Sequence, residues 1–220
     1  MDDRTKAELL KRVSIFADLS DSEIETLARL EAVREFPKDT PIIHRMDPGD
    51  SMFIIASGKV KVSLYGEDGR EIILSTLGPG DFFGEMSLLD QEPRSADVTT
   101  KEDAVLLQLK RDDFVSHVQK FPSVALNILA EMSRRLRRAD EKIGNLVLLD
   151  VYGRVARVLL EISQNEGVVT DEGIVIENRP THQEIASMIG TSRETVSRVL
   201  SDLSKDGYIR VHGKKIVLKG

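Results

Sequence analysis

The chain has 220 residues, of which 40% are hydrophobic, and a formal net charge of −6. This length is enough for two modest domains, each with its own core. The absence of cysteine excludes disulfides, thiolate zinc sites, cysteine-ligated iron–sulfur clusters and a cysteine nucleophile. The sequence has no apolar run of about 18 residues and no signal-peptide pattern, so we expect a cytoplasmic protein without a membrane partner.

The charge is unevenly distributed along the chain. Residues 1–120 carry 16 Lys and Arg against 24 Asp and Glu, a net of −8, whereas residues 175–220 carry 8 against 5, a net of +3. An acidic N-terminal part repels phosphates, so any contact with nucleic acid is expected at the basic C-terminal end.

The N-terminal half changes its apolar periodicity near residue 33. Residues 5–30 have apolar side chains at helical spacing, and Ser20 with Glu23 matches a capping box, which predicts two short helices. From 33 to 109 the period is two, in short β-branched runs such as residues 52–55 and 59–64. Turn signals separate these runs about every ten residues, a rhythm typical of a sandwich or jelly-roll barrel.

The segment from Gly84 to Ala96 has the parts of a nucleotide site. Arg94 and Ser95, with the backbone N–H groups that follow Gly84, suit a singly charged cyclic phosphodiester. The Glu85 carboxylate suits a ribose 2′-hydroxyl and can be oriented by the nearby arginine, while Pro93 makes the loop more rigid. The alternative is a plain ion pair between Glu85 and Arg94 in a turn.

A long helix is predicted from Pro122 to about Leu148. Its apolar residues follow the alternating three-and-four spacing of a coiled coil, which favours a parallel homodimer; they are Leu129, Met132, Leu136, Ala139, Ile143 and Leu146. The alternative is a helix packed on its own barrel, since Ile128 and Val147 lie off this stripe. The arginines at 134, 135, 137 and 138 are expected on a mainly solvated face, from which an inward-leaning side chain can reach a ligand.

The C-terminal part predicts a helix capped by Asp150, a strand pair over 167–177, and then two helices joined by Gly190. Ala186 is small enough for a helix crossing and Ser192 is a suitable N-cap, so the pattern predicts a helix-turn-helix. On the second helix Val196, Val199 and Leu200 are expected inside. The alternative is an amphipathic helix with an ordinary charged face.

Several side chains of this region are expected to contact DNA. Arg193, Glu194 and Arg198 point outward, where arginine can read guanine and glutamate can read cytosine. Residues 207–218 predict a two-stranded wing turning at His212-Gly213, with Lys214 and Lys215 neutralising phosphates. The remaining candidates are expected to contact phosphates and so to position the protein on DNA, and His182 is expected on either a phosphate or a base. These candidates are Thr181, His182, Gln183, Ser192 and Thr195.

The nucleotide segment and residues 191–198, Thr-Ser-Arg-Glu-Thr-Val-Ser-Arg, resemble the cyclic-AMP receptor protein (catabolite activator) and Fnr family over essentially the whole chain. The resemblance implies an α+β fold: a cyclic-nucleotide-binding β-barrel (jelly roll) at 1–121, a dimerisation helix and hinge at 122–149, and a winged helix-turn-helix at 150–220. It implies ligand contacts at Gly84, Glu85, Arg94 and Ser95, and we expect Met86 and Ser87 of the same segment, Gly84 to Ala96, to join them. This segment is called the cassette below.

The family also implies cyclic AMP as an allosteric effector rather than a cofactor, a TGTGA-like half-site in double-stranded DNA, a homodimer, and RNA polymerase as a partner. Enzyme activity is not expected, because the four histidines are scattered, without metal-ligand spacing or a nucleophile elbow. An orphan regulator that binds DNA without a ligand is a rival hypothesis.

One departure from the family pattern concerns the base of the nucleotide. Members that answer to cyclic AMP typically place Thr-Ser on the long helix, where this chain has Ala139-Asp140. An ionised carboxylate only accepts hydrogen bonds, and guanine offers it N1–H and the N2 amino group together. Cyclic GMP or cyclic di-GMP is therefore an alternative effector, unless Asp140 pairs with an arginine such as Arg137.

Overall fold

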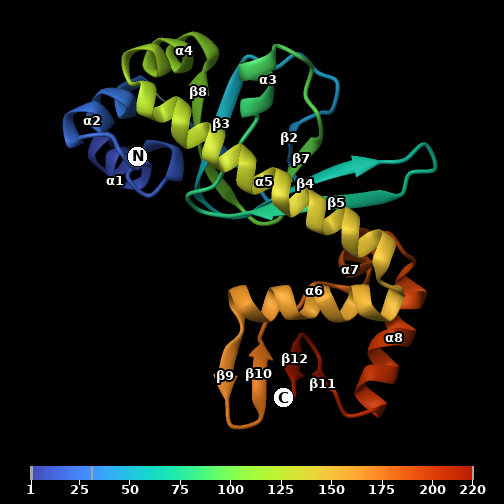
Figure 1. The fold of residues 1–220 in the computed structure, drawn as a ribbon. Coiled ribbons are helices and arrows are strands. Elements are labelled where there is room, and N and C mark those ends of the chain that lie inside the picture. The colour runs from blue at the N-terminus through green and yellow to red at the C-terminus, as the bar shows by residue number, and fades with distance from the viewer. Residues whose placement is uncertain (1, 31, 220) are drawn as a thin grey trace. The chain divides into compact units, whose positions relative to one another are not determined.

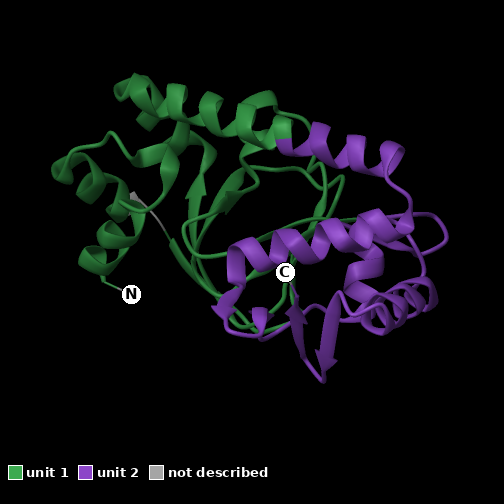
Figure 2. Ribbon diagram, turned by 60° about the horizontal axis from the view of Figure 1, so that its bottom comes forward, with its two compact units in different colours: residues 1–64, 74–137 green, residues 65–73, 138–220 purple. Residues whose placement is uncertain are grey.

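The computed structural model describes residues 2–30 and 32–219. The chain divides into two compact units, residues 1–64 with 74–137 and residues 65–73 with 138–220 (Figure 2). The helix Pro122–Leu148 continues across the boundary between them.

The first unit begins with the two predicted helices, α1 (Asp3–Leu10) and α2 (Asp21–Leu30), joined by a 3-10 turn at Ser14–Phe16 (Figure 1). The Asp2 side chain accepts from Thr5 N at 2.8 Å and caps α1. Before α2, the Glu23 carboxylate accepts from both Ser20 N and the Ser20 hydroxyl, at 2.7 Å each. Only the glutamate half of the expected capping box forms, because Glu23 N bonds to Ser20 O instead.

Eight strands follow and form two four-stranded sheets, ordered β1-β8-β3-β6 and β2-β7-β4-β5. Their bounds are β1 Ala32–Phe36, β2 Pro41–Ile43, β3 Ser51–Ser57, β4 Val60–Tyr65, β5 Glu71–Leu77, β6 Phe82–Phe83, β7 Asp97–Thr100 and β8 Ala104–Lys110. The central pair β3 and β8 runs antiparallel, with Ser51 opposite Lys110 and Ile55 opposite Leu106. The β-domain predicted from the period-two pattern is thus confirmed.

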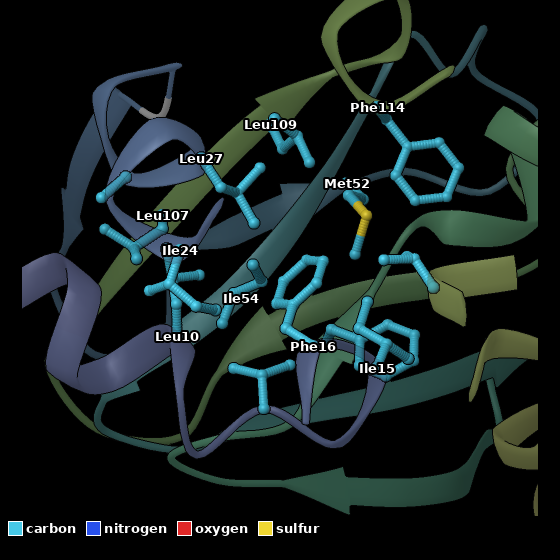
Figure 3. Packing of buried hydrophobic residues seen from close by; sticks show 14 of the residues in the cluster. Leu10, Ile15, Phe16, Ile24, Leu27, Met52, Ile54, Leu107, Leu109 and Phe114 are labelled. Atoms are coloured by element: carbon cyan, nitrogen blue, oxygen red, sulfur yellow. The ribbon is translucent and has the colours of Figure 1, made fainter. Parts of the chain in front are cut away.

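The sheet that contains β3 and β8 is buried on both faces. On β3, Met52 and Ile54 join a cluster with the N-terminal helices, while Phe53 and Ile55 join a second cluster with strands of the other sheet. This alternation explains why residues 52–55 are apolar without interruption. Figure 3 shows the first cluster, in which Phe16 and Leu27 lie near Met52 and Ile54.

Two further helices follow, α4 (Arg111–Lys120) and α5 (Pro122–Leu148), and α5 belongs to the first unit up to residue 137. The prediction that a helix begins at Pro122 is confirmed. Val124 and Ile128 are buried in the core cluster, and Met132 packs partly against it. On α5, Leu129, Leu136 and Ile143 are instead 60–64% exposed. The predicted stripe is therefore divided, because Met132 serves the domain's own core and the three residues seven apart do not.

The second unit has helices α6 (Val151–Glu166), α7 (His182–Ile189) and α8 (Arg193–Lys205). Its strands β9 (Val168–Thr170), β10 (Gly173–Ile176), β11 (Ile209–His212) and β12 (Lys215–Leu218) form one sheet, ordered β11-β12-β10-β9. The expected hairpin and wing both form, and the pairing of β10 with β12 joins them. The three helices pack around Val155, Ile185, Ala186 and Val196, among others.

His117 gives the first unit a pH-dependent stability. The ring lies between Phe16 and Phe121, with centroid distances of 6.3 and 4.6 Å. Burial, opposed by the Glu23 carboxylate, lowers its pKa. The unfolded chain therefore takes up a proton at higher pH than the folded one, and stability falls as the pH drops below the unfolded pKa of about 6.5.

We expect His117→Leu to remove this part of the pH dependence, because leucine has no proton to take up. Urea unfolding of both proteins at pH 7.5 and pH 5.0 measures it, since other titrating groups cancel in the difference. On lowering the pH from 7.5 to 5.0, the free energy of unfolding of the variant should fall less than that of the wild type. A difference between the two proteins that is the same at both pH values contradicts this expectation.

Candidate nucleotide and DNA sites

Gly84 begins the ligand cassette at the junction of β6 and α3 (Glu85–Asp90). Its φ of 82° lies in the left-handed region, which favours glycine. A Cβ at this position would also lie 2.7 Å from Arg94 Nη1 and 3.2 Å from Ser51 O. Both backbone conformation and space therefore require glycine, and its lack of a side chain lets the arginine approach the chain.

Arg94 is 6% exposed and is held by backbone carbonyls. Its Nη1 donates to Gly84 O at 2.8 Å and its Nη2 to Ser51 O at 2.7 Å. Burial lowers its pKa, and the carboxylates of Asp50 and Glu85 oppose the change. Arginine stays charged in proteins, so the cassette contains a fixed buried cation with N–H groups left for an anion.

Glu85 is paired with an arginine of the long helix rather than with Arg94. Arg135 Nη1 donates to Glu85 Oε1 at 3.0 Å and Nη2 to Phe82 O at 2.7 Å. The guanidinium carbon lies 4.5 Å from the Phe82 ring centroid. The plain Glu85–Arg94 ion pair expected as the alternative does not form, and the orienting arginine comes from α5.

The second Glu85 oxygen, Oε2, is buried without a hydrogen-bond partner among the described residues. Burial raises the pKa of this carboxyl group, and the charge of Arg135 acts against that change. An unpaired buried acceptor beside a fixed cation suits a ligand that carries both a hydroxyl group and an anionic group.

The other ligand candidates lie in different surroundings. Ser95 is exposed and its hydroxyl lies 3.6 Å from the Met86 sulfur, whereas Ser87 is buried. Ala139 and Asp140 are exposed and belong to the second unit. In the described part of the chain Asp140 forms no ion pair, so the expected alternative pairing with Arg137 is absent.

Sequence reasoning missed the role of Arg135. The sequence has four arginines within five residues, at 134, 135, 137 and 138. No neighbouring residue indicates which of them turns toward the barrel. Its partner Glu85 is 50 positions away along the chain.

The helix-turn-helix is formed by α7 and α8. Thr181 and Glu184 make a reciprocal capping box, with Thr181 Oγ1 accepting from Glu184 N at 3.1 Å. Gly190 adopts a φ of 67° between the helices, and Ser192 caps α8 by accepting from Thr195 N at 3.2 Å. These caps fix where each helix begins.

The outer face of α8 carries the expected base-reading residues. Arg193, Glu194, Ser197, Arg198 and Ser201 line a surface hollow, while Val196, Val199 and Leu200 are buried. Neither Arg193 nor Arg198 forms an ion pair within the described residues. Their guanidinium groups are therefore available for an external acceptor.

The remaining DNA-binding candidates lie before and after α8 along the chain. His182 begins α7, and burial together with the charges of Arg179 and Arg193 lowers its pKa. Gln183 follows it in the first turn of α7. Lys214 is exposed in the turn of the wing, whereas Lys215 Nζ lies 2.6 Å from Glu177 Oε2. Lys214 is thus the wing lysine with the freer charge.

Comparisons with known proteins agree with this arrangement of a barrel with a charged cassette and a helix-turn-helix. The family model for the cyclic nucleotide-binding domain matches residues 33–121, and the one for the Crp-like helix-turn-helix domain matches residues 153–219. Together they define a DNA-binding transcription regulator with a cyclic nucleotide-binding domain.

The chain is 36% identical over 211 residues to the CRP-like cAMP-activated global transcriptional regulator of Mycobacterium tuberculosis, covering 96% of this chain and 94% of that protein. It is 36% identical over 190 residues to the cAMP-activated global transcriptional regulator CRP of Escherichia coli O157:H7, covering 86% and 90%. The solved structure of the c-di-GMP responsive global regulator CLP of Xanthomonas campestris matches with a TM-score of 0.81 and 28% identity, covering 91% and 100%.

The chain therefore belongs to the cyclic AMP receptor protein family of transcription regulators, whose members are not enzymes. Across residues 2–30 and 32–219 no helix combines the length and apolar character that crossing a membrane requires. The same residues contain no group of three or more histidine, aspartate or glutamate side chains placed to hold a metal ion.

The Glu85–Arg135 pair can be tested by a double-mutant cycle. Arg135→Ala leaves a carboxylate that is 4% exposed without its cation, which should lower the free energy of unfolding by on the order of 2 kcal/mol. Adding Glu85→Gln removes the unpaired charge and should restore part of the loss. Urea unfolding of the four proteins measures this coupling, and strictly additive losses would show that the two side chains do not interact.

Proposed function

We propose that this protein is a homodimeric, sequence-specific transcription regulator whose DNA binding is controlled by a cyclic nucleotide. The observation that carries the proposal is the contact of Arg135, a residue of the long helix, with the Glu85 carboxylate of the cassette. A ligand that bonds to Glu85 changes the environment of a side chain on the helix that leads toward the DNA-binding region. Control requires the ligand to bind one conformation more tightly than the other, since a ligand with equal affinity for the two conformations leaves their populations unchanged.

The proposed ligand contacts are those of the cassette. Arg94 and the backbone at the start of α3 face the phosphate, and Glu85 accepts from the ribose hydroxyl. Met86, Ser87 and Ser95 complete the site next to Gly84. Cyclic AMP is our first choice of effector, because two relatives at 36% identity carry names that describe cAMP activation.

A guanine cyclic nucleotide is the second candidate, and Asp140 is the observation that favours it. Its carboxylate is exposed and forms no ion pair in the described part of the chain, so it can accept from guanine N1–H and N2. The CLP structure is that of a c-di-GMP responsive regulator, which gives a precedent in the same family.

The exposed stripe of α5 is the proposed dimer contact. Leu129, Leu136, Ile143 and Leu146 are 50–64% exposed, and their burial against a second copy removes apolar area from water. Ala139 lies between them at coiled-coil spacing and permits close approach, while Met132 borders the contact from the domain core.

For DNA we propose a TGTGA-like palindrome read by two α8 helices about 34 Å apart. Arg193, Glu194 and Arg198 read bases, and Lys214 and Lys215 approach phosphates. Thr181, His182, Gln183, Ser192 and Thr195 position the helices on the backbone. The division of labour is residues 1–121 for the ligand, 122–149 for dimerisation and 150–220 for DNA, in a cytoplasmic protein that acts on RNA polymerase.

Arg94→Ala should abolish the ligand response while leaving weak nonspecific DNA binding, because the fixed cation of the cassette is lost but α8 is untouched. Fluorescence anisotropy with a labelled TGTGA palindrome, with and without cyclic nucleotide, measures both. The exposed Arg29→Ala is a matched control that should respond like the wild type. A ligand-stimulated affinity that survives in Arg94→Ala would falsify the pocket assignment.

Arg193→Ala should cost about 1–3 kcal/mol on the cognate site and relax specificity at one base pair. Lys214→Ala should weaken binding to all DNA sequences alike and reduce the salt dependence of binding by about one charge. Competition assays over single-base variants of the palindrome distinguish the two. Uniform weakening by Arg193→Ala would instead mark a phosphate contact.

A further inference from the structure

A tyrosine at the start of α6 is hydrogen-bonded to α8, the helix that carries the candidate base-reading residues. The Tyr152 hydroxyl donates to Asp202 Oδ2 at 2.6 Å, although the two residues are 50 positions apart in the sequence. The Asp150 side chain caps α6 and fixes the turn that carries the tyrosine. Val155 of α6 and Val199 of α8 are both buried in the core cluster of the second unit, so packing of the two helices holds this contact in place.

Asp202 lies four residues after Arg198 on α8. Residues at this spacing lie on the same face of an α-helix, where a guanidinium and a carboxylate attract each other. Both oxygens of Asp202 have other partners, since Oδ2 accepts from Tyr152 and Oδ1 lies 3.8 Å from Lys205 Nζ. Within residues 2–30 and 32–219, Arg198 forms no ion pair. The pair that the sequence spacing favours is therefore absent.

The tyrosine, the aspartate and the arginine are nevertheless neighbours. The hydrogen bond to Asp202 raises the pKa of the Tyr152 hydroxyl, and the charge of Arg198 acts against this change. Arg198 lines the surface hollow on the outer face of α8, next to Ser197 and Ser201, whereas Asp202 is not part of that lining. The carboxylate is thus turned toward Tyr152, and the guanidinium is left at the hollow.

A carboxylate paired with Arg198 would oppose a contact between this arginine and DNA. It would accept from guanidinium N–H groups that otherwise donate to a base or a phosphate. Its negative charge would also repel the phosphates and cancel the attraction of the arginine. A group that holds Asp202 elsewhere therefore favours DNA binding without touching DNA itself.

We propose that Tyr152 is a positioning residue of the DNA-binding surface, which keeps the Arg198 guanidinium unpaired and available to DNA by holding the Asp202 carboxylate. The inference rests on the proposed function, in which Arg198 reads a base. Because Tyr152 acts through Asp202, its hydroxyl matters only while position 202 carries a negative charge.

The first test is nuclear magnetic resonance of the full chain without DNA, so its result does not depend on the proposed function. In Tyr152→Phe the carboxylate is released and pairs with the arginine, so the Arg198 Nε–H resonance should move downfield. Adding Asp202→Asn should return this resonance toward its wild-type position, because no charged partner remains. A resonance that does not move in Tyr152→Phe would overturn the proposal.

The second test is a double-mutant cycle on DNA affinity, measured by fluorescence anisotropy with the labelled TGTGA palindrome at one salt concentration, with and without cyclic AMP. Tyr152→Phe should weaken binding about two- to fivefold, because an ion pair between residues four apart competes on each of two α8 helices. In the Asp202→Asn background the same change should have no effect.

Tyr65→Phe is the matched control. It removes a tyrosine–carboxylate hydrogen bond of the same kind, to Glu71 Oε1 at 3.0 Å, from a position outside the DNA-binding region, and should bind DNA like the wild type. An equal loss from Tyr152→Phe in both backgrounds would overturn the proposal, because the hydroxyl would then contact DNA directly. If the wild type does not prefer the palindrome to unrelated DNA, the proposed function fails, while the resonance of Arg198 still decides this inference.

Discussion

The contact of Arg135 with Glu85 is the interaction on which the account of this protein depends. It places a cation of the long helix on a carboxylate that is 4% exposed, 50 positions away in the sequence. Because one oxygen of that carboxylate has no partner among the described residues, the pair is incomplete without a further donor. A ligand hydroxyl that fills this need acts on the helix and the barrel together, which is a physical basis for coupling.

The fold also holds a second cation of the cassette, Arg94, in a buried position. Arg94 is held by two carbonyls and packs against Gly49 and Gly84, neither of which leaves room for a Cβ. The sheet that supplies Ser51 is packed on both faces, and this packing holds in place the Ser51 carbonyl that accepts from Arg94. Preorganised donors lower the ordering cost of binding an anion.

The periodicity of the sequence predicted the elements well, because helices, strands and caps are local. The start of the long helix at Pro122, the turn at Gly190 and the cap at Ser192 all follow from neighbouring residues. The site was less predictable, because Arg135, Ser51 and Gly49 join it from distant positions. Met132 shows the same limit on α5, since heptad spacing alone does not reveal which apolar residue the domain's own core uses.

The most direct measurement is the affinity of cyclic AMP, with cyclic GMP and cyclic di-GMP in parallel, for the free protein and for its complex with a TGTGA palindrome. Binding free energies are reciprocal, so a nucleotide that tightens DNA binding must itself bind the complex more tightly by the same factor. A matched change of this kind, typically 5- to 150-fold, is expected for one of the three nucleotides. Equal nucleotide affinity in the presence and absence of DNA would contradict it.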